Sequence, residues 1–193
     1  MNRRHFLQSA SSAALGTAAT SCSTLPLGKP DALIIDTHQH LWDRTQINPP
    51  WLSGAPEILR HDYRTEEYLK AFEGLNVKAI YMEVDVAPSD HIKEADTLVQ
   101  QCRDGRTPTI AATIGGRPVA PDFEPYIKRY AGNGIVKGLR QVLHGSSTPQ
   151  GFCLTKEFVH GAQNLGKDWV SFGLTMRPAV LADGAHVLQQ RPD

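Results

Sequence analysis

Short apolar runs alternate with amphipathic segments along most of the chain. Apolar runs bounded by turn residues predict buried strands at 32–38, 77–85, 109–114, 136–144 and 170–176. The continuous run Leu33-Ile34-Ile35 is typical of a parallel strand buried on both faces. Between the strands, apolar residues recur at helical spacing and predict helices at 65–75, 89–104, 122–131, 154–165 and 179–190. This alternation predicts βαβ units around a parallel sheet.

Two α/β architectures fit such units. A nucleotide-binding doubly wound fold carries a glycine-rich phosphate loop after a strand, and no strand here is followed by one. The absence of this phosphate loop weakens the doubly wound alternative without excluding it. The other architecture is the TIM barrel, which usually needs about 250 residues. We therefore predict an α/β fold of the (βα)8 TIM-barrel type, truncated after about five βα units, with the chain ending where a sixth strand is expected.

Two local features refine this prediction. The connection at 41–62 has no sustained period and is rich in proline and glycine, which is typical of a binding loop or lid. The helix at 89–104 is expected to begin with Ser89 as its cap. Its predicted buried stripe consists of Ile92, Ala95, Leu98, Val99 and Cys102.

Composition narrows the function classes. The chain has 193 residues, is 40% hydrophobic and 21% charged, and has a formal net charge of zero, which is ordinary for a globular protein. No basic cluster with interleaved aromatic residues is present, which argues against a nucleic-acid partner. Cys102 and Cys153 do not make a disulfide framework.

The N-terminal 1–30 segment is predicted to be an export signal and linker, and 31–193 the barrel domain. Arg3 and Arg4 precede Phe6-Leu7 and a mildly apolar stretch that is too short and too polar for a transmembrane span. This pattern indicates a twin-arginine signal and a periplasmic location. A disordered or amphipathic N-terminus is the alternative. Cys22 is a candidate site for a lipid anchor.

Polar side chains gather where the predicted strands end. In βα barrels the active site forms at the C-terminal ends of the strands. His38 and His40 lie two residues apart, so an extended strand projects both from one face. The later strands end in Glu83, with Tyr81 and Asp85 on the same face, in Arg140 and His144, and in Arg177, with Thr175 before it.

The stretch Ile35-Asp36-Thr37-His38-Gln39-His40-Leu41-Trp42-Asp43 resembles the first strand of the amidohydrolase-related (amidohydrolase 2) barrel hydrolases. The nearest branch looks like the lactonases of the L-fuconolactonase and 2-pyrone-4,6-dicarboxylate lactonase type. Further matching stretches are Pro50-Trp51-Leu52, Tyr81-Met82-Glu83, Gly138-Leu139-Arg140 and Leu174-Thr175-Met176-Arg177-Pro178. The resemblance covers about residues 32–193 and stops short of the family's second half.

The residue types suggest roles. His38, His40 and Glu83 are candidate ligands of one divalent cation, zinc being the candidate metal. Arg140 and Arg177 offer bidentate forks for a substrate carboxylate or an oxyanion, and His144 is a further candidate catalytic residue. The resemblance implies a further ligand histidine on strand six, a general-base aspartate on strand eight, and lactonases that hold their metal weakly or use none.

Structural alternatives stay open for several of these residues. Arg140 could pair with Glu83 across the barrel mouth, and Arg177 could cap the next helix. Asp85 and His144 could be solvated strand ends. The remaining histidines of the barrel domain are expected at the surface: His61, His91, His160 and His186.

Three functional hypotheses follow. The first is a metal-assisted or metal-independent hydrolase of a lactone or related cyclic ester, with a carboxylate-bearing or sugar-acid substrate, inactive as this truncated chain. The second is a decarboxylase of the same superfamily. The third is a non-catalytic half-barrel, either a remnant or a subunit that depends on an oligomer or on a complementing fragment.

Overall fold

The computed structural model describes residues 32–145, 147–165 and 171–190. The chain divides into two units, Met1–Asp31 and Ala32–Asp193. The predictions for 1–30, which include the export signal and Cys22, lie outside the described residues.

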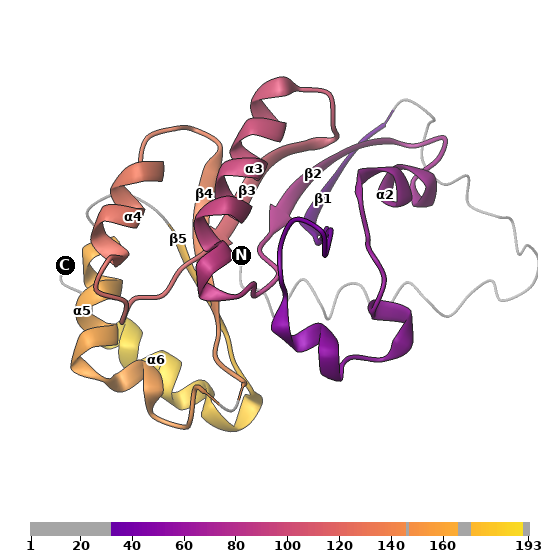
Figure 1. Cartoon of the computed structure of the whole chain (residues 1–193). Coiled ribbons are helices and arrows are strands. Elements are labelled where there is room, and N and C mark those ends of the chain that lie inside the picture. The colour runs from indigo at the N-terminus through magenta and orange to yellow at the C-terminus, as the bar shows by residue number, and fades with distance from the viewer. Residues whose placement is uncertain (1–31, 146, 166–170, 191–193) are drawn as a thin grey trace, which may run out of the picture. The chain divides into compact units, whose positions relative to one another are not determined.

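In the second unit, the described residues form one sheet of five parallel strands. They are β1 (Leu33–Gln39), β2 (Asn76–Met82), β3 (Thr109–Gly115), β4 (Val136–Val142) and β5 (Ser171–Thr175). Their spatial order is β1-β2-β3-β4-β5, the same as their order along the chain (Figure 1). A doubly wound sheet reverses its strand order at a switch point, and this sheet does not. The strands thus follow one another as in a TIM barrel, which confirms the predicted fold class.

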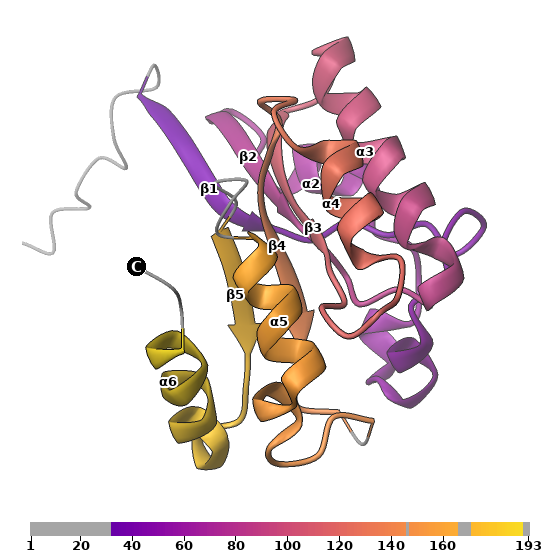
Figure 2. The same cartoon turned by 90° about the vertical axis from the view of Figure 1, so that its left-hand side faces the viewer.

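The helices follow the strands in the expected alternation. They are α2 (Thr65–Ala71), α3 (His91–Asp104), α4 (Phe123–Tyr130), α5 (Lys156–Leu165) and α6 (Leu181–Gln189). Figure 2 shows α3, α4 and α5 side by side along one face of the curled sheet. None of the helices in the described ranges is long and apolar enough to cross a membrane.

Several helix boundaries differ from the prediction because tight 3-10 turns precede the α-helices. Pro88–Asp90 precedes α3, Phe152–Leu154 precedes α5 and Pro178–Val180 precedes α6. Asp90, rather than Ser89, occupies the N-cap of α3, and its carboxylate accepts the Asn48 backbone N–H at 2.8 Å. The cap side chain is thus used to hold the β1–α2 connection.

The main core lies between the sheet and the helices. Tyr81, Ala112, Ile114 and Leu139 of the strands pack with apolar residues of α3 and α4, and a smaller cluster centres on Phe158 of α5. Close approach is required at one point, because a Cβ on Gly161 would collide with the carbonyl oxygen of Pro118. This glycine therefore sets how near α5 comes to the β3–α4 loop.

The first strand is not buried on both faces as predicted. Leu33, Ile34 and Ile35 are 57%, 37% and 43% exposed. In the described residues β1 pairs with β2 alone, so its other edge and part of its surface stay open. An apolar run indicates that a strand can be buried on both faces, and the neighbours present decide whether it is.

The β1–α2 connection is folded rather than structureless. It contains the 3-10 turns Pro50–Gly54 and Glu57–Leu59, and a bridge between Trp42 and Tyr63 closes its ends. The indole of Trp42 donates to the His61 carbonyl at 2.7 Å, and that of Trp51 to the Val84 carbonyl at 2.6 Å. The connection is thereby fixed against the segment that follows β2.

Candidate active site

The sheet register brings the predicted residues to one edge. Glu83 directly follows the last residue of β2. Gly115 pairs with Arg140, and Val142 pairs with Thr175, so His144 and Arg177 each lie two residues past that last pair of β4 and β5. Because all the strands are parallel, these residues and the β1 histidines share the C-terminal edge, where βα barrels carry their active sites.

The two histidines of β1 lie against each other at this edge. The His38 and His40 rings have centroids 4.8 Å apart and are nearly perpendicular, at 81°. Nδ1 of His40 donates to the Met82 carbonyl at 2.9 Å, which leaves Nε2 as the unprotonated nitrogen of the neutral ring. Burial lowers the pKa of His40 despite that bond, and the positive charge of Arg140 lowers it further. His40 is therefore neutral at neutral pH, the form that binds a metal.

Glu83 and Arg140 form a buried ion pair. Nε of Arg140 donates to Oε1 of Glu83 at 2.6 Å, and a terminal nitrogen donates to the Glu83 carbonyl at 2.8 Å. The other carboxylate oxygen accepts the Asp85 backbone N–H at 2.6 Å. The Glu83 side chain is 0% exposed and the Arg140 side chain is 12% exposed. The ion pair between Arg140 and Glu83, which was the structural alternative for Arg140, is therefore present. The assignment of Glu83 as a metal ligand stays a prediction.

Two of the three predicted ligands of a divalent cation are well placed to bind one. His38 and His40 suit two ligands of a divalent cation, because the Met82 carbonyl orients His40 as outer-shell acceptors orient metal-bound histidines. Glu83 fits less well, since both of its oxygens already accept strong hydrogen bonds. Among the described residues, no group of three or more histidine, cysteine or acidic side chains gathers as a metal site.

His144 and Arg177 lie at the same edge but are exposed to solvent. Arg177 occupies the N-cap position of the 3-10 turn Pro178–Val180, without a capping bond from its side chain. Its backbone carbonyl accepts the Val180 N–H at 3.0 Å. Arg177 thus caps the following turn through its backbone and not through its side chain. Its guanidinium faces solvent, where a ligand could reach it.

Sequence reasoning missed His91, which is 8% exposed instead of lying at the surface. A Cβ on Gly115 would lie 3.6 Å from the His91 ring and 3.6 Å from Oε2 of Glu83, so both side chains pack near this glycine. Burial, followed by the charge of Arg117, lowers the pKa of His91 to about 4. The sequence did contain a signal that His91 is buried. Position 91 lies four residues before Ala95, which places both residues on the buried stripe of the helix.

Glu94 is the second missed residue, and it takes the inward place predicted for Ile92. Ile92 is 46% exposed, whereas Glu94 is 3% exposed. Oε1 of Glu94 accepts the Tyr81 hydroxyl at 2.9 Å and the Val84 N–H at 3.0 Å. Burial, followed by the charge of Glu83, raises the pKa of Glu94 to about 7. Tyr81 therefore contacts α3 and does not face the barrel mouth beside Glu83 as expected.

An ion pair links the next loop to the same network. Arg117 donates to Asp85 at 2.8 Å, and Asp85 has a left-handed backbone with φ of 50°. That conformation turns its N–H onto the Glu83 carboxylate. Asp85 thus ties the β3–α4 loop to the buried pair, which differs from a simple solvated strand end.

The fold resembles that of solved amidohydrolases. Amidohydrolase 2 from Bifidobacterium longum subsp. infantis is 28% identical, with a TM-score of 0.58 over 82% of this chain and 57% of that chain. The fold is that of the amidohydrolase barrels. An amidohydrolase from Burkholderia multivorans matches 82% of this chain in two crystal forms. With bound HEPES it is 21% identical, with a TM-score of 0.65 and 54% of its chain covered; with bound zinc the values are 20%, 0.55 and 66%.

The chain spans between about half and two thirds of the length of the structures it matches. No protein-family model and no curated relative matches it. The structural neighbours support the amidohydrolase part of the predicted resemblance at the level of the fold.

Proposed function

We propose that this amidohydrolase-type barrel hydrolyses a lactone or a related cyclic ester that carries a carboxylate or is derived from a sugar acid. The observation that carries the proposal is the His38–His40 pair at the strand edge, with His40 close enough to Arg140 for its charge to lower the histidine pKa. The neutral imidazole of His40 beside a fixed guanidinium suits the attack of water on a carbonyl. In that reaction water adds to the acyl carbon, the ring C–O bond breaks, and the alkoxide leaving group takes a proton.

The chain's own residues divide the work by charge. Arg140 is held rigid by Glu83, and its remaining N–H groups bind the substrate carboxylate or the oxyanion of the attacked carbonyl. Arg177 supplies a second, exposed guanidinium fork, and His144 is the candidate proton donor to the leaving group. His38 and His40, with Glu83 as the candidate third ligand, would hold a zinc ion, which when bound polarises the carbonyl and acidifies a water.

We also propose that the 193-residue chain alone has no lactonase turnover. The exposed apolar residues Leu33, Ile34 and Ile35 line an open sheet edge, which suits pairing with further strands, from a complementing fragment or a second copy. The proposed export through Arg3 and Arg4 would place the protein in the periplasm, with Cys22 as a candidate anchor.

The test uses a complete barrel, made by joining residues 32–190 to the C-terminal half of a solved amidohydrolase relative. We expect His38→Ala, His40→Ala and Arg140→Ala each to reduce lactone hydrolysis at least about 100-fold, as loss of an acid–base or oxyanion-stabilising group does. His160→Ala, at an exposed position on α5, is the matched histidine control.

Near wild-type turnover of all three variants would contradict the proposal. Analysis of the products separates the alternatives, because a lactonase yields the ring-opened hydroxy acid whereas a decarboxylase releases carbon dioxide.

A further inference from the structure

A cleft lies between the β1–α2 connection and α3. Its volume is about 260 Å3. Leu41, Trp42, Ile47 and Leu98 give it apolar walls. None of the proposed ligands or catalytic residues lines it. The cleft is therefore lined by other residues than those proposed for catalysis, although Leu41 directly follows His40.

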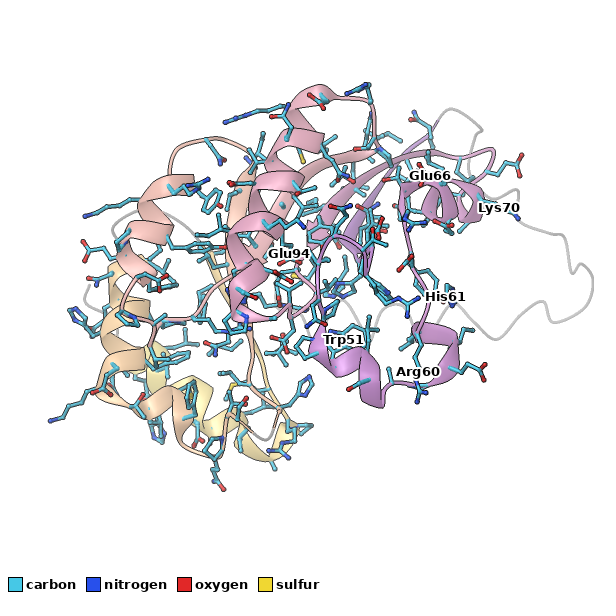
Figure 3. All side chains as sticks on the ribbon, viewed as in Figure 1. Trp51, Arg60, His61, Glu66, Lys70 and Glu94 are labelled. Carbon is cyan, nitrogen blue, oxygen red and sulfur yellow. The ribbon has the colours of Figure 1, made fainter. Side chains whose placement is uncertain are left out.

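One buried carboxyl group lies in this apolar surrounding. Glu94 lines the cleft, and in Figure 3 it lies between α3 and the connection that carries Trp51 and His61. Its Oε1 is fully used, because it accepts both the Tyr81 hydroxyl and the Val84 N–H. Its Oε2 is buried and has no hydrogen-bond partner among the residues that the structure describes. A buried oxygen without a donor is costly, so a donor delivered by a ligand would be stabilising.

The charges around the cleft favour a cation. Its charged lining residues are Asp43, Arg64, Glu66 and Glu94. The only base among them, Arg64, is already occupied, since it donates to Asp43 at 2.7 Å and to Asp62 at 2.8 Å. Negative charge is thus in surplus.

We propose that this cleft binds a small organic cation, with an apolar body in the cleft and a primary ammonium or amidinium group that donates to Oε2 of Glu94. The volume is close to the lower end of ligand pockets, which suits one ring with a short arm. The raised pKa of Glu94, about 7, has burial as its main cause, and a cation at Oε2 would counter that penalty.

Benzylammonium is the probe, and benzyl alcohol is its neutral counterpart. Calorimetric titration of the 193-residue chain at pH 8 is expected to show benzylammonium binding more tightly than benzyl alcohol. Glu94→Gln should weaken benzylammonium binding at least about tenfold, because it removes a charge-assisted hydrogen bond, and should leave benzyl alcohol binding nearly unchanged.

A second pair of variants tests the place without touching the carboxyl group. Thr97→Phe, at an exposed position that lines the cleft, should block it and abolish binding. Lys93→Phe, exposed on the same helix outside the cleft lining, should bind as the parent does. Circular dichroism verifies that each variant is folded.

Two results would overturn the proposal. One is no detectable benzylammonium binding at millimolar concentration, which would mean that the cleft holds water only. The other is equal binding by the parent and by Glu94→Gln or Thr97→Phe, which would place the cation elsewhere. Neither result bears on lactone hydrolysis, which uses other residues.

Discussion

Replacing Glu94 with glutamine is expected to change how stability depends on pH. Glutamine has nearly the shape of a protonated glutamic acid, so its carbonyl oxygen keeps the bonds from Tyr81 and Val84. What the variant loses is the negative charge at a site that is only 3% exposed. Any difference that grows with pH therefore reports the cost of ionising this carboxyl group in the folded protein.

The expected magnitude follows from the two pKa values. Burial raises the pKa of Glu94 from an ordinary value of 4.5 to about 7. A carboxyl group with a raised folded-state pKa contributes stability that is fully present below pH 4.5 and is lost as the pH rises through about 7. The full effect is about 3 kcal/mol. Glu94→Gln should match the parent at pH 4 and exceed it by about that amount at pH 8.

His91 provides the opposite dependence and an internal control. Burial lowers its pKa from 6.5 to about 4, so its contribution is present above pH 6.5 and is lost as the pH falls through 4. Between about pH 4.5 and 6.5 the two groups oppose each other, and the parent should show a flattened profile. His91→Gln should gain on the parent as the pH falls, whereas Glu94→Gln gains as it rises.

The assay is urea denaturation of the parent and of both variants from pH 4 to pH 9, followed by circular dichroism. The free energy of unfolding is extrapolated to water at each pH, and the difference from the parent is plotted. A Glu94→Gln difference that stays constant over the whole range would refute the reasoning, because it would show that Glu94 ionises in the folded protein as easily as in the unfolded chain.

Three further outcomes are expected. Arg140→Met should lower the free energy of unfolding by about 3–5 kcal/mol in urea denaturation, because it leaves a buried carboxylate unpaired; a loss below about 1 kcal/mol would contradict the buried pair. Gly161→Ala should cost at least about 1–3 kcal/mol in the same assay, since the new Cβ meets the Pro118 carbonyl, and an unchanged midpoint would contradict that close approach. Changing both Arg3 and Arg4 to lysine should retain the protein in the cytoplasm on cell fractionation, because recognition of the pair needs guanidinium groups; unchanged periplasmic recovery would rule out the twin-arginine signal.

Local pattern was enough to determine the architecture of the barrel unit. All five predicted strands and all five predicted helices are present, with boundaries shifted by a few residues. The shifts concentrate where 3-10 turns open a helix, as at Pro88–Asp90, because tight turns and first helical turns have similar sequences. The shared orientation of His38 and His40 could also be predicted, since residues two apart on a strand point to the same face.

The environment of the site residues was not readable from the sequence. Glu83 and Arg140 are 57 positions apart, and the sequence allowed either a metal ligand or an ion pair. His91 was expected at the surface and Glu94 was not among the predicted buried residues, because polar side chains are usually exposed, yet both face the interior from α3.

The division has a physical reason. Hydrophobic periodicity and the strand pleat are local properties, so the alternation of strands and helices, the apolar runs and the edge that carries the histidines follow from the sequence by itself. The order of the strands in the sheet, which excludes a doubly wound fold, came from the tertiary structure. Burial, charge pairing and the resulting pKa values depend on which side chains meet across the sheet and the helices. Only the tertiary structure decided that Arg140 would hold Glu83, and that Glu94 would be buried with one carboxylate oxygen unpartnered beside an open cleft.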